Sequence, residues 1–328
     1  MLLTAENGVQ ERAGLDGDIL TLPEAPPLLP IPIESLRSLP LDLKYFVKTI
    51  WEEFRPQFLN RDKSLAAWCP IRTSPYKTQF RVFSMDNASL SAILTLCRQH
   101  KTTITGLLNG LALIAFTLRL DSTAAPAFQS STIVDHRRNL PPAPADAPWG
   151  SSDRAVSNYV TQLPHRFEAD LVARVRSKLP IDSNEDIDLS AELQQELWEI
   201  SAQNRLEIVR KLEAGLRNDV VGIFKYVTDW QKTMSDMANR PRQFTWIITN
   251  VGVLKGSTSN DQKWSVERAQ FGLSAEIPAA AIEFAQASVA GRGICVSANW
   301  ADCAVDVKFG ERIMADLERW LAQLASQS

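Results

Sequence analysis

The stretch that most constrains this fold is 81–120, which predicts a short strand followed by two helices. In the first helix, 89–101, apolar residues recur at helical spacing along one face. Asn87 or Ser89 can cap that helix by accepting hydrogen bonds from free backbone N–H groups. The second helix, 104–119, has apolar residues on every face, so we expect it to be buried all round. Such a helix needs a sheet or other helices on several sides.

Composition narrows the class of protein. The chain has 328 residues, 45% of them hydrophobic, and nine tryptophans, enough for a sizeable core in one or two domains. Its net charge of −3 gives no reason to expect nucleic acid or an anionic membrane as a partner. We find neither a membrane span nor a signal peptide, and the four cysteines have no Cys-x-x-Cys spacing. We therefore expect a cytoplasmic protein with reduced thiols and no metal site.

The remaining pattern predicts the fold class α/β, a mixed sheet flanked by helices. The expected strands are 79–83, 131–135, 156–163, 243–250, 264–273, 281–289 and 294–300. The expected helices are 41–54, 89–101, 104–119, 167–179, 185–213, 219–238 and 307–325. Glycines between the last two strands allow the positive φ angles of a hairpin turn.

Prolines divide the chain into two parts. Six of them lie between Pro23 and Pro40, where fixed φ angles and missing N–H donors predict an extended crossover linker. We therefore expect residues 1–76 to form a tail, this linker and one helix. Residues 77–328 should form the main domain.

Six segments occur in an order that resembles the fungal alcohol acetyltransferase family, within the chloramphenicol-acetyltransferase-like superfamily that also holds the plant BAHD acyltransferases. They are TQFRVFSMDNASLSAILTLCRQHKTTITGLLNGLALIAF, TIVDHRRNLPP, SNYVTQL, WIITNVGVL, WSVERAQFGLSA and GICVSANW. The resemblance covers about residues 20–325. Two positions depart from the family pattern, with Ser157 where glycine is usual and Thr249 where serine is usual.

The resemblance implies a two-domain enzyme of fungal secondary metabolism with its active site in a channel between the domains. A histidine in a His-x-x-x-Asp motif of the first domain would deprotonate a small-molecule alcohol or amine, because a neutral hydroxyl is a weak nucleophile. That nucleophile would attack an acyl-CoA such as acetyl-CoA, which is a co-substrate and not a permanently bound cofactor. Placed donors would stabilise the resulting oxyanion.

None of the three histidines of this chain begins a His-x-x-x-Asp motif. By the resemblance the chain corresponds to the crossover and the C-terminal domain, the half of the fold that follows the motif. Three alternatives stay open besides an active acyltransferase: a non-catalytic remnant, a small-molecule binding module, and half of a split enzyme completed by a partner chain. A surface left bare by the missing domain also predicts self-association.

The candidate catalytic residues are Thr249, Asn250 and His136. The resemblance places the first two at a strand end lining the channel, where a side chain can hydrogen-bond the acyl oxyanion. They can equally be polar side chains that cap the end of a strand. His136 is the best histidine to replace the lost base, although a surface turn residue is the favoured interpretation. We expect His100 to lie at a helix end and His165 to lie in a solvated loop.

Two aromatic residues are candidates for a hydrophobic acceptor pocket, Tyr159 and Trp300, although a tryptophan on a strand is more often part of the core. Residues 251–257 lack the Gly-Lys-Ser/Thr ending of a phosphate-binding loop. The cysteines provide no Cys–His pair.

Overall fold

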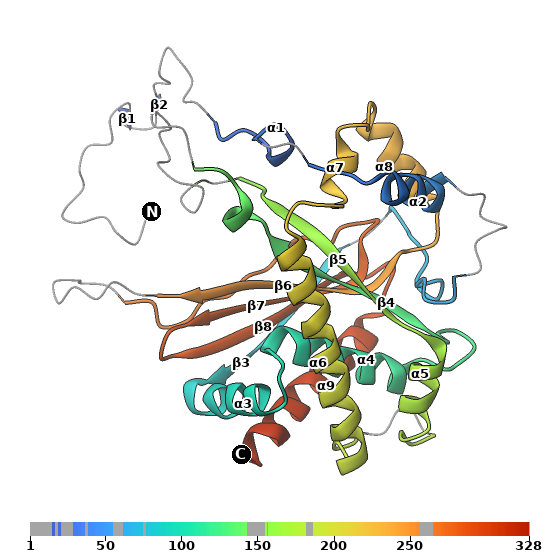
Figure 1. Ribbon diagram of the computed structural model, residues 1–328. Coiled ribbons are helices and arrows are strands. Elements are labelled where there is room, and N and C mark those ends of the chain that lie inside the picture. Colours follow the sequence, from blue (N-terminus) through green and yellow to red (C-terminus); the bar gives the residue numbers. More distant parts are fainter. Residues whose placement is uncertain are drawn as a thin grey trace.

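A six-stranded mixed sheet forms the centre of the protein, seen in a computed structural model (Figure 1). The structure describes residues 15–16, 19–20, 29–36, 39–54, 62–74, 77–142, 155, 157–181, 186–255 and 265–327. The strands of this sheet, in spatial order, are β3 (Thr78–Asp86), β8 (Gly293–Ala301), β7 (Ala280–Val289), β6 (Phe244–Leu254), β4 (Phe128–Asp135) and β5 (Val160–Phe167). A separate two-stranded pair consists of β1 (Leu15–Asp16) and β2 (Ile19–Leu20).

The central sheet is mixed because β6 runs parallel to both of its neighbours, β4 and β7. The other pairs, β3 with β8, β7 with β8, and β4 with β5, are antiparallel. The hairpin expected between β7 and β8 is confirmed. Its turn needs Gly293, which has a φ of 132° and lies so close to Met85 that a Cβ atom would meet the Met85 carbonyl oxygen at 2.1 Å.

Five helices cover one face of the sheet, which we call the helix-covered face (Figure 1). They are α3 (Asn87–Gln99), α4 (Ile104–Arg119), α5 (Ala169–Arg176), α6 (Ala191–Ala214) and α9 (Val307–Ser326). As predicted, α4 is buried on all sides: every residue from Thr105 to Leu118 is buried, and Phe116 stacks on Trp246 of β6 at 5.3 Å. The caps differ from the prediction, because Asp86 and not Asn87 or Ser89 caps α3.

The other side of the sheet, which we call the opposite face, is covered more thinly. Four short helices lie on this side, α1 (Ile33–Leu36), α2 (Leu43–Phe54), α7 (Val221–Phe224) and α8 (Trp230–Ala238) (Figure 1). The edge of Phe46 on α2 packs against the ring of Tyr226 at 5.2 Å. Residues 75–76, where we placed the boundary between linker and main domain, lie outside the described residues, and that boundary stays a prediction.

The strand expected over 264–273 is wrong for the described part of that segment. Residues 265–276 form no strand and instead cross the opposite face, where Ser297 Oγ donates a hydrogen bond to the Phe271 carbonyl oxygen. Gly272 lies against the ring of Phe80. The physical reason is that β7 and β8 each already have two neighbours, so no backbone groups remain there for another strand to pair with. We call residues 265–276 the crossing segment.

Other boundaries also differ from the prediction. β5 begins at Val160, four residues later than expected, and it contains Pro164, which is tolerated because β5 is an edge strand. The helix expected over 185–213 begins at Ala191, after Ser190 caps it. The helix expected over 219–238 is interrupted and forms α7 and α8. Residues Arg137–Asn139 form a short 3-10 turn, η3, after β4.

Among the described residues, no single helix has the length and apolar character to cross a membrane, and only the bent pair α3–α4 meets the criteria jointly.

Candidate functional site

Thr249 and Asn250 lie in the middle of β6 and point in opposite directions. Trp246 and Ile248 belong to the core on the helix-covered face, so the alternation of a strand sends Thr249 to the opposite face. The Thr249 side chain is half-buried and has no hydrogen-bond partner among the described residues. Its hydroxyl is therefore available to donate to a ligand.

The side chain of Asn250, by contrast, is hydrogen-bonded through both its oxygen and its nitrogen. Its Nδ2 donates to Thr105 Oγ1 on α4 at 3.1 Å, and its Oδ1 accepts from the backbone N–H of Gly252 at 2.8 Å. Gly252 has a φ of 90°, and the register with β7 shifts between Asn250 and Gly252. Gln286 Nε2 donates to the same threonine oxygen at 3.2 Å. Because β6 continues to Leu254, these bonds hold Asn250 at a bulge inside the strand and not at a strand end. A role for Asn250 in catalysis stays a prediction.

A row of polar side chains continues across the opposite face. Thr249 lies beside Ala285 of β7, which in turn lies beside Ser297 of β8. Two residues earlier on β7, Glu283 is 8% exposed and accepts a hydrogen bond from Asn299 Nδ2 at 2.8 Å. Burial raises the pKa of the Glu283 carboxyl to about 7. Sequence reasoning missed this residue, although a single acidic residue in an otherwise apolar strand is a recognisable signal.

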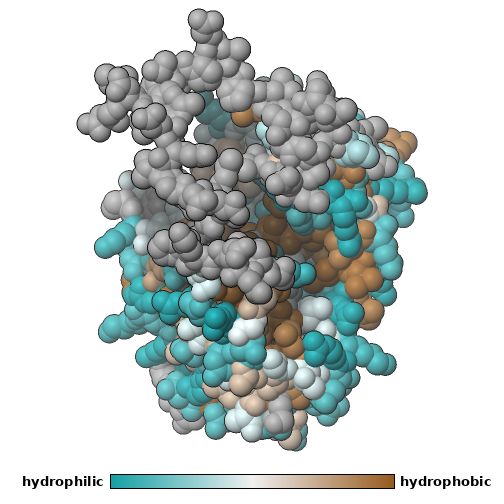
Figure 2. Space-filling view, turned by 90° about the vertical axis from the view of Figure 1, so that its left-hand side faces the viewer, coloured by the Kyte–Doolittle hydropathy of each residue, from teal (hydrophilic) through white to brown (hydrophobic). Residues whose placement is uncertain are grey.

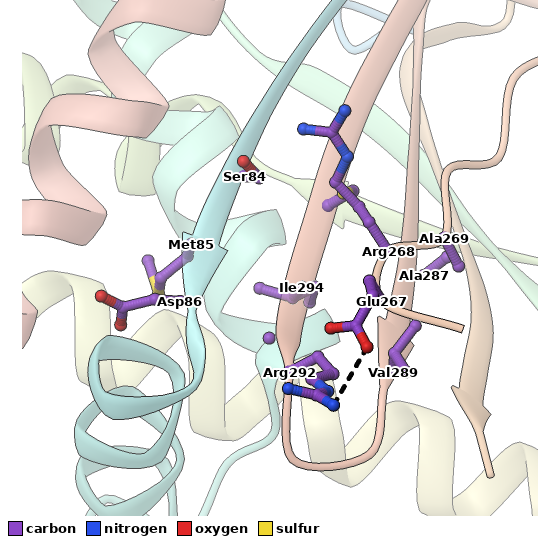
Figure 3. A pocket seen from close by; sticks show the side chains of 12 residues that line it. Ser84, Met85, Asp86, Glu267, Arg268, Ala269, Ala287, Val289, Arg292 and Ile294 are labelled. Carbon is purple, nitrogen blue, oxygen red and sulfur yellow. Dashed lines mark ion pairs between the residues drawn. The ribbon is translucent and has the colours of Figure 1, made fainter. Parts of the chain in front are cut away.

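An open pocket of about 390 Å³ lies where β7 turns into β8, beside the end of β3 (Figure 3). We call it the edge pocket; its lining is Ser84, Met85, Asp86, Glu267, Arg268, Ala269, Ala287, Val289, Arg292, Gly293, Ile294 and Cys295. Ala287 is two residues beyond Ala285 on β7, so it shares a face with Thr249. The crossing segment supplies one wall. Figure 2 views the molecule from the end where β6 and β7 finish, and hydrophobic residues gather there in a recess bordered by polar ones.

His136 is not a surface residue, so our favoured interpretation of it was wrong. The side chain is fully buried at the end of β4, and its Nε2 bonds Asp219 Oδ2 at 2.8 Å. Asp219 also accepts from Thr161 at 2.7 Å and from Lys211. Although burial alone would raise it, these bonds hold the pKa of the Asp219 carboxyl well below its usual range. His136 therefore ties β4 to the segment that precedes α7.

His165 is also buried, where we expected a solvated loop. It lies within β5, 1% exposed, with Nε2 2.9 Å from Thr132 Oγ1 and Nδ1 2.5 Å from Glu207 Oε2. His100 ends α3 as expected and stacks on Trp198 at 4.3 Å. Both ring nitrogens of His165 are committed, and so His165 has no free nitrogen for a substrate.

Tyr159 and Trp300 lie in different hydrophobic clusters and do not share a pocket. Trp300 is 1% exposed and packs against Gly310 of α9. Tyr159 is 2% exposed and donates its hydroxyl proton to the Ile31 carbonyl oxygen at 3.2 Å. Their role in binding an acceptor stays a prediction.

Potential metal ligands are scattered in the described part of the chain. It contains no group of three or more His, Cys, Asp and Glu side chains arranged to hold a metal ion, and all four cysteines are free thiols.

Comparison with solved structures defines the fold class. The chain is similar to the trichothecene 15-O-acetyltransferase from Fusarium sporotrichioides, with a TM-score of 0.57 and 13% identity, over 90% of this chain and 54% of that one. It is also similar to the epimerization domain from the third module of tyrocidine synthetase B, with a TM-score of 0.51 and 11% identity, over 87% and 56% of the two chains. The protein thus has the mixed α/β fold that this acetyltransferase and this epimerization domain share.

The sequence comparison is more specific. The chain is 24% identical to a probable alcohol acetyltransferase of Fusarium pseudograminearum over 304 residues, which is 91% of this chain and 57% of the relative. No protein-family model matches it. The resemblance to fungal alcohol acetyltransferases is confirmed, and the chain spans little more than half the length of these relatives.

Proposed function

We propose that this chain is the C-terminal half of an acyl-CoA-dependent O- or N-acyltransferase of fungal secondary metabolism, acting in the cytoplasm on a small-molecule alcohol or amine. The observation that carries the proposal is the hydroxyl of Thr249, which has no hydrogen-bond partner among the described residues and faces the side of the sheet that holds the edge pocket. The similarity to an alcohol acetyltransferase supports it.

In the proposed reaction the acceptor oxygen or nitrogen bonds to the thioester carbonyl carbon, and the carbonyl oxygen becomes an oxyanion. Thr249 Oγ–H donates a hydrogen bond to that oxyanion. The carbon–sulfur bond then breaks, and the proton that a base removed from the acceptor passes to the CoA thiolate. His136 and His165 are buried and bonded to carboxylates, so we propose that the base comes from a second polypeptide segment.

The test is a free-thiol release assay with acetyl-CoA and a panel of alcohols and amines. We expect no turnover above background by the 328-residue chain alone, because a positioned base contributes about 10²–10⁴-fold. Turnover should appear when the chain is mixed with the N-terminal half of the Fusarium pseudograminearum relative, provided that half carries a His-x-x-x-Asp motif. In that mixture Thr249→Val should lower kcat by about 10²-fold, while Thr249→Ser keeps activity.

Two outcomes would contradict the proposal. If Thr249→Val is as active as the wild-type chain in the mixture, Thr249 is not the oxyanion donor. If the chain alone is active and His136→Ala abolishes the activity, His136 is the base after all.

A second candidate function is a binding module without chemistry. The hydrogen bonds of His136, His165 and Asn250 to neighbouring side chains favour it, since these bonds stabilise the fold and occupy both buried histidines. Saturable ligand binding with no turnover in any mixture would support this alternative.

A further inference from the structure

We propose that the edge pocket binds a small molecule that has an apolar body and one acidic group, a carboxylate or a phosphate, and that Arg268 recognises the acidic group. The identity of this molecule as the acceptor or the acyl donor rests on the proposed function. The binding itself does not, because a module without chemistry would bind the same ligand.

The charges that line the pocket decide its preference. Two are acidic, Asp86 and Glu267, and two are basic, Arg268 and Arg292 (Figure 3). The four formal charges sum to zero, but three of the four side chains have an ion-pair or hydrogen-bond partner among the described residues.

Glu267 and Arg292 neutralise each other. Their side chains form an ion pair at 3.0 Å, marked in Figure 3, that joins the crossing segment to the β7–β8 turn. Asp86 is committed as the cap of α3, since its carboxylate accepts the backbone N–H of Ser89 at 2.8 Å. That hydrogen bond lowers the pKa of Asp86, so this carboxylate stays ionised and bound to the helix end.

Arg268 is the charge that remains. It has no ion pair or hydrogen bond with another described residue, and in Figure 3 its side chain extends over β8, away from the Glu267–Arg292 pair. Its charge also reaches the pocket floor: burial raises the pKa of the Cys295 thiol, and Arg268 opposes that increase. A guanidinium presents several N–H donors in a planar fork that matches a carboxylate or a phosphate.

The floor of the pocket is suited to an apolar body. Ala287 and Val289 present apolar side chains to it from β7, whereas the side chains of Met85 and Ile294 belong to the core on the helix-covered face. The volume of about 390 Å³ lies within the range of small-molecule sites. Because Ala287 and Thr249 share one face of the sheet, a ligand held by Arg268 would extend along β7 toward the Thr249 hydroxyl. The structure thus places an acid-recognising group and a hydrogen-bond donor on the same surface.

The experiment compares two ligands of the same shape by isothermal titration calorimetry at low ionic strength. The probes are 4-hydroxyphenylacetate and its neutral amide, 4-hydroxyphenylacetamide. We expect the acid to bind about tenfold more tightly, equivalent to ~1.4 kcal/mol. Arg268→Met, which keeps the length of the side chain and removes its charge, should reduce this preference to within about twofold. The matched control Arg98→Met removes an exposed arginine of α3 and should leave the preference unchanged.

A second arm separates the two sources of the acidic group. Adenosine 3′,5′-bisphosphate carries phosphates like those of CoA but has no hydroxyphenyl body. If it binds and Arg268→Met abolishes its binding, the acidic group is the phosphate of the acyl donor; if only the hydroxy acid depends on Arg268, it is the carboxylate of the acceptor. The inference is overturned if no probe binds saturably, or if Arg268→Met weakens the binding of neither the hydroxy acid nor adenosine 3′,5′-bisphosphate.

Discussion

The two faces of the central sheet differ at one polar side chain each, Asn109 on the helix-covered face and Thr249 on the opposite face. On the helix-covered face, the Asn109 side chain donates to Thr132 and Asn204 and accepts from Ser130 and Trp246, all within 3.2 Å. On the opposite face, Thr249 has no partner among the described residues and the crossing segment has no strand pairing. The hydrogen-bonding atoms of Asn109 are thus occupied, although the Nδ2 of its partner Asn204 is buried without one. A bonded side chain stabilises one arrangement, whereas a hydroxyl without a described partner can donate to a ligand.

The largest effect should come from breaking the network on the helix-covered face. Asn109→Ala would leave Ser130 Oγ and Trp246 Nε1 without their acceptor. It would also create a cavity between α4 and the sheet. We expect the free energy of unfolding to fall by about 4 kcal/mol. Urea denaturation followed by tryptophan fluorescence measures it. A loss below about 1 kcal/mol would mean that water or neighbouring side chains satisfy the network as well as Asn109 does.

The next effect concerns the buried carboxyl on the opposite face. Burial raises the pKa of Glu283 to about 7 in the folded protein, against about 4.3 in an unfolded chain. The folded state therefore holds this proton to higher pH, so its contribution to stability is fully present below about pH 4.3 and is lost as the pH rises to about 7. The charged groups that act on Glu283 are Glu276 and Arg242, and the latter donates to the backbone carbonyls of Cys69, Ile277, Ala279 and Ala280.

Glu283→Gln removes this titration and keeps the shape of the side chain. Between pH 5 and pH 8 we expect the wild-type chain to lose about 3 kcal/mol more stability than the variant, in paired urea titrations. Equal pH dependence in the two proteins would show that Glu283 is hydrated in the folded state and titrates normally.

A smaller effect should appear at the crossing segment. Ser297→Ala removes the hydrogen bond to the Phe271 carbonyl oxygen and a longer one, 3.4 Å, to the Ala285 carbonyl oxygen of β7. It should loosen residues 265–276 by about 1 kcal/mol and affect β7 much less. Amide hydrogen exchange resolves the two regions, and exchange should accelerate mainly in the segment. Acceleration throughout β7 and β8 would show that the segment is an integral part of the sheet.

The smallest effect is expected at the proposed donor itself. Thr249→Val replaces a hydroxyl that has no described partner with a methyl group, so the free energy of unfolding should change by no more than about 0.5 kcal/mol. Thr249→Val and Asn109→Ala thus compare the loss of stability when one polar side chain is removed from each face of the sheet. A loss above about 1 kcal/mol would indicate that Thr249 serves the fold and is not reserved for a ligand.

Local sequence determined the elements and much of their burial. The apolar residues on every side of α4 predicted its complete burial, and the strands now seen as β3, β4, β6, β7 and β8 follow from short apolar runs between turn residues. The order of the six family segments predicted the α/β fold class and the resemblance that the comparisons confirm. These features depend on the spacing of side chains along the chain, which the sequence records directly.

Tertiary structure decided the surroundings of the polar residues. His136 and His165 are buried because Asp219 and Glu207, 83 and 42 residues away in the chain, supply their partners. Residues 264–273 have a strand-like pattern, but the sheet offers no free edge at β7 or β8. The position of α4 beneath β6 decides that Asn250 is hydrogen-bonded to Thr105, while Thr249 on the other face is not in contact with that helix. Contacts between distant segments set burial and hydrogen bonding, and no local pattern encodes them.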